Sequence, residues 1–154
     1  MTSKKINVLK RIILSLTALM CFCNSQAQTN DTIKKYKEIL IGDKWITSSI
    51  LGLDTSIVTY ILTKPNQSPQ FGSITLFSDS LHFISGYHGK CGNDSFTSVR
   101  GDYRFIDENK IAISTSQVSY SGYWKKPTEY RKPNYLIFVI STIENTTIIL
   151  TKEK

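Results

Sequence analysis

Eight short segments rich in β-branched and aromatic residues follow one another along most of this chain, and they limit its fold more than any other feature. Isoleucine, valine, threonine, tyrosine and phenylalanine dominate them, and these residues favour strands. The segments are Lys44–Ile50, Ser56–Thr63, Gly72–Phe77, Leu81–Ser85, Phe96–Ile106, Lys110–Tyr120, Tyr135–Thr142 and Thr146–Thr151. Polar turns at Ser78–Ser80, Asp107–Asn109 and Glu144–Asn145 join neighbouring segments, so we expect hairpins and antiparallel pairing.

This pattern predicts an all-β fold, either a closed antiparallel barrel of about eight strands or a two-sheet β-sandwich. We favour the barrel, because closure leaves no exposed strand edges. One short helix is expected over Thr32–Ile41, with Gly42 as the left-handed residue that ends it. Residues 28–42 are thus predicted to be a polar leader and short helix, and residues 43–154 a single β-barrel domain.

Residues 1–27 have the order of a secretory signal peptide. A basic stretch from Lys4 to Arg11 precedes the apolar run Ile12–Cys23, and the small residues Ser25 and Ala27 follow. Cleavage after Ala27 predicts a periplasmic or secreted protein. The apolar run is too short to cross the ~30 Å hydrocarbon core, so no transmembrane span is expected in the mature form.

Two of the three cysteines, Cys21 and Cys23, lie in this predicted signal. Cys91 is then the only cysteine of the mature chain, which excludes an internal disulfide. The alternative interpretation is a membrane-anchored lipoprotein modified at Cys21 or Cys23. It is less favoured, because Met20 and Phe22 stand where lipidation requires a small residue.

Charge also changes when the signal is removed. It holds four of the 19 Lys and Arg and none of the 12 Asp and Glu, so 15 basic and 12 acidic residues remain and the net charge falls from +7 to +3. We therefore expect no nucleic-acid partner. About 127 residues remain, which suffice for one domain with its own core.

The glycine-rich segment 86–94 contains Cys91 and His88. A Cys–His pair could serve as nucleophile and base or as part of a metal site. We favour a plain turn between strands, because a metal would need two further ligands and the sequence has no Cys-x-x-Cys or His-x-His spacing. His82 is expected to face solvent or to make a single hydrogen bond in the core.

The segment 120–135 interleaves aromatic and basic side chains: Tyr120, Tyr123, Trp124, Lys125, Lys126, Tyr130, Arg131, Lys132 and Tyr135. Such a mixture suits polyanions, sugars, anionic lipid head groups or a protein partner. The preferred interpretation is a solvated loop whose aromatic rings pack onto the rim of the domain, but it is also the best candidate for a recognition surface. No nucleophile elbow, phosphate-binding loop or paired acids in an apolar setting occur, so we predict no catalytic residue, metal or cofactor.

Gly42-Asp43-Lys44-Trp45 follows the predicted helix and opens the first strand. This stretch resembles the start of lipocalin-like barrels, in which the tryptophan closes one end of the barrel. The resemblance implies a basic residue of the last strand over the indole, for which Lys152 is the candidate. It also implies a small apolar or amphipathic ligand in the barrel mouth.

The stretch from Ser85 to Ile113 resembles the META-type β domains of bacterial envelope proteins. The matching residues are Gly86, Tyr87, Cys91, Asn93, Gly101, Tyr103, Ile111 and Ile113. This resemblance implies an antiparallel β domain with an envelope or stress-associated role and no assigned reaction. Fold-level resemblance supports architecture better than function.

Together these observations predict an exported, non-enzymatic binding protein whose partner is an unidentified small molecule or protein. The candidate ligand-binding residues are Trp45, Tyr87, His88, Tyr103, Tyr123, Trp124 and Arg131. One alternative is a protein-interaction module of inhibitor or immunity type that uses the 121–134 loop. A third hypothesis is an enzyme that uses Cys91 and His88.

Overall fold

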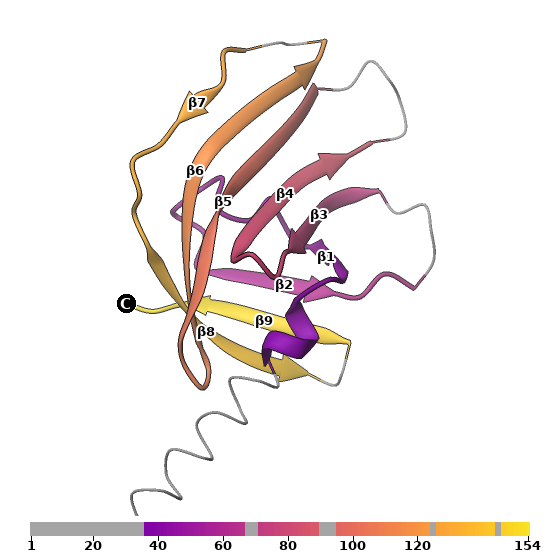
Figure 1. Ribbon diagram of the computed structural model, residues 1–154. Coiled ribbons are helices and arrows are strands. Elements are labelled where there is room, and N and C mark those ends of the chain that lie inside the picture. The colour runs from indigo at the N-terminus through magenta and orange to yellow at the C-terminus, as the bar shows by residue number, and fades with distance from the viewer. Residues whose placement is uncertain (1–35, 67–70, 90–94, 124–125, 144–145) are drawn as a thin grey trace, which may run out of the picture.

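The computed structural model describes residues 36–66, 71–89, 95–123, 126–143 and 146–154, and they form a mostly antiparallel sheet (Figure 1). Its strands are β1 (Lys44–Thr47), β2 (Thr59–Thr63), β3 (Gly72–Phe77), β4 (His82–His88), β5 (Ser95–Asp107), β6 (Lys110–Gly122), β7 (Glu129–Tyr130), β8 (Leu136–Ile143) and β9 (Thr147–Lys152). One short helix covers residues 36–40. The predicted all-β, antiparallel class is confirmed.

Eight of these strands close into a ring of hydrogen-bonded neighbours. The order is β1-β3-β4-β5-β6-β8-β9-β2, and β2 pairs back to β1. Continuous pairing makes the sheet barrel-like, rather than two separate layers of a sandwich. β7 pairs with β6 alone and lies outside the ring (Figure 1).

Large side chains fill the interior of this ring. Because the alternating residues of each strand face opposite sides, one set from every strand points inward. Phe77 and Tyr103 meet edge to face with ring centroids 5.1 Å apart, and Tyr60 meets Phe138 at 5.8 Å. Other fully buried members are Trp45, Leu62, Phe83, Val99, Ile111, Val118, Ile148 and Leu150.

Both ends of the ring are covered. The helix at residues 36–40 lies at the end where β1 begins. Gly42 follows it with a φ of 84°, which confirms the predicted left-handed residue. The connection from residue 48 to residue 58 leaves from the other end of β1. Leu40 and Leu51 are both fully buried, so each cover adds a side chain to the core.

Two predicted strands are shorter than expected. The first ends at Thr47 instead of Ile50, and the second begins at Thr59 instead of Ser56. The apolar residues of the intervening segment form the cover instead of pairing as strands. In addition, the predicted 121–134 loop contains β7, whose pairing partners Gln117 and Val118 lie on β6.

The predicted signal and leader, the start of the predicted helix, Cys91, Trp124 and the 144–145 turn lie outside the described residues. Within the part of the chain that is described, no helix has the length and apolar content needed to span a bilayer.

Candidate functional site

Trp45 and Tyr103, two of the predicted ligand-binding residues, belong to the core. The Trp45 indole Nε1 donates to the carbonyl of Leu40 at 3.2 Å, and its side chain is fully buried. The Tyr103 hydroxyl donates to the carbonyl of Ser78 at 2.5 Å. Both residues therefore help to close the helix end of the ring.

The cation beside Trp45 is Lys64, whose Nζ lies 5.6 Å from the indole centroid and 2.7 Å from the Asp43 carboxylate. The lipocalin resemblance implied Lys152 for this place, and that assignment is wrong. The Nζ of Lys152 donates instead to the carbonyl of Thr55 at 2.8 Å, so it holds the cover at the opposite end of the ring.

Tyr87 and His88 lie at the end of β4 and are exposed. They line a groove of about 530 Å³ with residues of β1, β3 and β5. Cys91 is outside the described residues, so the structure does not place it relative to His88.

In the aromatic and basic segment 120–135, some side chains are packed and others are exposed. The Tyr120 hydroxyl donates to Glu129 Oε1 at 2.6 Å, and this bond to a carboxylate raises the pKa of Tyr120. Tyr135 stacks against the Arg104 guanidinium at 4.6 Å. Tyr123 and Tyr130 are 75% and 82% exposed, so packing onto the rim holds only for part of the segment.

Arg131 joins the segment after β7 to the 48–58 cover. Its backbone N–H donates to the carbonyl of Ser116 at 2.9 Å, which extends the pairing of β7 with β6. Its Nη1 donates to the carbonyls of Gly52 and Leu53 at 3.3 and 3.0 Å. Glu129 Oε2 lies 3.7 Å from Nη2, and the Arg131 side chain is 32% exposed.

A pocket of about 210 Å³ lies beside this guanidinium, between the cover, β6 and the start of β8. Ile113, Leu136 and Phe138 form its apolar wall, and Arg131 and Lys132 supply two cations. Polar groups of Thr55, Thr115 and Asn134 complete the lining, and the Thr115 hydroxyl donates to the carbonyl of Gly52 at 2.8 Å.

Of the predicted candidates that the structure describes, Arg131 alone lines this pocket, while Tyr87 and His88 share the outer groove. The sequence did not indicate that Ile113, Leu136 and Phe138 line a pocket, because their pattern is that of ordinary strand and core residues. Sequence reasoning also missed Gly52 and Thr55, which lie between two predicted strands and carry no local sign of their distant contacts.

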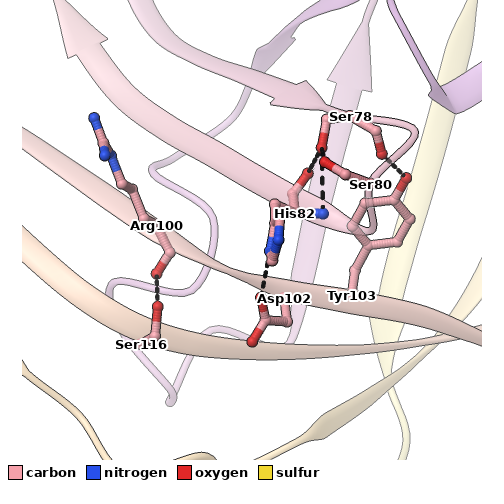
Figure 2. A network of polar contacts seen from close by, with 7 residues as sticks. All are labelled: Ser78, Ser80, His82, Arg100, Asp102, Tyr103 and Ser116. Atoms are coloured by element: carbon pink, nitrogen blue, oxygen red, sulfur yellow. Dashed lines mark hydrogen bonds and ion pairs between the residues drawn. The ribbon is translucent and has the colours of Figure 1, made fainter.

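A second polar network surrounds the turn between β3 and β4 (Figure 2). His82 Nδ1 lies 2.6 Å from Asp102 Oδ1 on the exposed face of β4 and β5, which confirms the expected solvent-facing histidine. The Ser78 hydroxyl accepts from the backbone N–H of His82 at 3.3 Å and donates to its carbonyl at 2.9 Å. Because Ser78 bonds the backbone of His82 rather than its ring, Figure 2 shows a braced turn and not a nucleophile–base pair.

Within the described residues, no group of three or more His, Cys, Asp or Glu side chains could hold a metal ion. Comparison of the chain with protein-family models, with curated proteins and with solved structures finds no match.

Proposed function

We propose that this chain is an exported, non-enzymatic binding protein that holds a small amphipathic anion in the pocket beside Arg131. The observation that carries the proposal is the composition of that pocket. An apolar wall of Ile113, Leu136 and Phe138 faces the cations of Arg131 and Lys132. Such a site suits a carboxylate with a short aryl or branched alkyl body.

Because side chains fill the interior of the ring, we place the ligand at the end of the ring. Aromatic rings and Leu51 occupy the space that an enclosed ligand would need. At about 210 Å³, the pocket is smaller than the ~300–1,000 Å³ typical of sites for drug-sized ligands, so its ligand is small. Glu129 Oε2 lies 3.7 Å from Arg131 Nη2, and no acidic residue is among the described residues that line the pocket, so its two cations are in excess there.

The proposal of export depends on residues 1–27 alone. Their basic, apolar and small-residue order is that of a cleaved signal peptide, which directs the protein to the periplasm or the extracellular space. N-terminal sequencing of the protein from its native envelope or culture medium tests this, and a chain that retains residues 1–27 there contradicts it.

Phenylacetate tests the ligand proposal, with neutral phenylacetamide as the comparison. We expect phenylacetate to shift the amide NMR signals of residues 52–55 and 131–136, and phenylacetamide to bind more weakly. Lys132→Glu should weaken phenylacetate binding about fivefold, because it reverses one of the two cations. Lys126→Glu, on another exposed lysine of the same segment, is the control. No shifts at these residues, or equal binding by the two variants, would exclude the site.

A protein-interaction module is the second candidate function. Tyr123 and Tyr130 are the most exposed large apolar side chains among the described residues, and tyrosine is enriched at protein interfaces. A photo-crosslinking residue at position 130 should then yield a discrete protein adduct in the native envelope. The same residue at position 143, where Ile143 is 57% exposed, is the control, and equal labelling at both positions argues against the module.

A further inference from the structure

The outer face of the ring carries an apolar groove across β1, β3, β4 and β5. We propose that this groove binds the alkyl chain of a single-chain anionic amphiphile, a fatty carboxylate, with its head group at Lys44. The groove shares no lining residue with the pocket beside Arg131, so the two sites are distinct.

The strand register builds the apolar surface. Leu76 on β3 pairs with Ile84 on β4, and both side chains point outward at 36% and 45% exposure. In the next row, Ile74 pairs with Gly86. Two adjacent rows of outward aliphatic residues are unusual on a sheet face exposed to water, where polar residues ordinarily alternate with the core positions.

Gly86 makes this surface a groove rather than a ridge. It pairs with Ile74 on one side and Ser98 on the other, and it contributes no side chain to the row. A Cβ at this position would lie 3.2 Å from the Ser98 Cβ and 3.3 Å from the Thr97 carbonyl oxygen. Phe96 forms the far wall on β5.

The width and volume of the groove fit a single extended alkyl chain. From β1 to β5 the groove crosses three strand spacings of ~4.8 Å each, so it is about 14 Å wide across the strands. Its volume of about 530 Å³ lies within the ~300–1,000 Å³ range of small-molecule sites.

The charge at one end selects an anionic head group. Lys44 pairs with Leu76 and lines the groove. The nearest acidic residue in sequence, Asp43, forms its ion pair with Lys64 at 2.7 Å. Among the described residues that line the groove, none is acidic. A carboxylate at Lys44 with its chain over Leu76 and Ile84 therefore satisfies both the charge and the apolar surface.

Fluorescence of 11-(dansylamino)undecanoate, below its micellar concentration, tests the proposal on the full-length mature chain. We expect a blue-shifted, saturable signal that dodecanoate displaces and that dodecyltrimethylammonium does not. Displacement by the cationic amphiphile with equal potency would overturn the assignment of the anionic head group. Binding to phosphatidylglycerol vesicles without binding of the monomeric probe would overturn the proposal as a whole.

Two matched pairs of variants locate the probe. Ile84→Glu should weaken binding at least tenfold, whereas Ile106→Glu should not, because Ile106 is equally exposed at 47% but lies outside the groove. Lys44→Gln should weaken binding about threefold, and Lys37→Gln on the exposed helix should leave it unchanged.

Lys132→Glu separates this site from the pocket beside Arg131. It should reduce phenylacetate binding and leave the dansyl probe unaffected. Loss of probe binding in Ile106→Glu or Lys132→Glu to the same degree as in Ile84→Glu would place the probe elsewhere and refute the groove.

Discussion

The backbone N–H of Leu51 donates a hydrogen bond of 2.9 Å to the hydroxyl of Ser85, which lies 34 residues later in the chain. Both residues are fully buried. The Ser85 hydroxyl also contacts the Thr75 hydroxyl at 2.7 Å, and Thr75 contacts that of Thr47 at 3.4 Å. The Leu51 N–H thus bonds the end of a row of three hydroxyls on β1, β3 and β4.

Ser85→Ala should destabilise the protein by about 1–3 kcal/mol, because it leaves the Leu51 N–H buried without its partner. Urea unfolding measures the change, and hydrogen exchange at Leu51 should accelerate more than at strand amides. Ser141→Ala, at an exposed serine on β8, is the control. It should change the free energy of unfolding by no more than about 0.5 kcal/mol, as surface substitutions usually do. Equal stability of the two variants would show that the Leu51–Ser85 bond does not hold the cover.

Ionisation of Tyr103 is expected to lower the stability of the folded protein at high pH. Burial of its phenol, and secondarily the negative charge of Asp79, raise the pKa of Tyr103 to about 12. The unfolded chain has a tyrosine pKa of about 10, so the unfolded state loses this proton first. The contribution of the neutral phenol to stability is complete below pH ~10 and is lost as the pH rises toward ~12.

Unfolding free energies measured between pH 8 and pH 12 test this linkage. The unmodified chain should lose about 2–3 kcal/mol more of its unfolding free energy than Tyr103→Phe over this range, because the side chain at position 103 titrates only in the unmodified chain. Tyr103→Phe should itself be less stable at pH 8, since it removes the hydrogen bond to the Ser78 carbonyl. Parallel pH profiles for the two proteins would contradict the raised pKa.

Local sequence patterns predict most of the strands. β3 has the predicted bounds, and the other ring strands overlap their predicted segments, because β-branched content and polar turns are properties of adjacent residues. Gly101, one of the residues behind the META resemblance, has a physical reason to be glycine. A Cβ there would lie 2.6 Å from Phe83 Cε1, in a place where the pairing of β5 with β6 shifts register.

The candidate sites depend on contacts that no local pattern encodes. Arg131 reaches Gly52 across 79 residues, and Thr115 reaches the same carbonyl across 63. The sequence predicts that residues 48–50 continue the first strand, yet β1 ends at Thr47 and the chain turns so that Leu51 is buried in the core. The sequence likewise could not show that Trp45 and Tyr103 are buried in the core, because aromatic residues are common both in cores and in binding sites.

The turn between β3 and β4 holds a residue in an unfavourable conformation. Leu81 has a φ of 63°, the left-handed region that costs a non-glycine residue about 1–2 kcal/mol. The turn enforces it: the Leu81 N–H donates to the Ser78 carbonyl at 3.3 Å, and the Leu81 carbonyl accepts from the Tyr103 N–H at 2.9 Å.

Leu81→Gly should therefore be more stable than Leu81→Ala by about 1 kcal/mol, the reverse of their order in regular structure. Both variants remove the same partly exposed side chain, so the comparison cancels the lost packing and isolates the backbone term. Thermal and urea unfolding of the two variants measure the difference. Ile84→Gly and Ile84→Ala on β4 provide the control pair, and there alanine should be the more stable. If alanine is also the more stable at position 81, Leu81 is not strained in solution and the turn adopts another conformation.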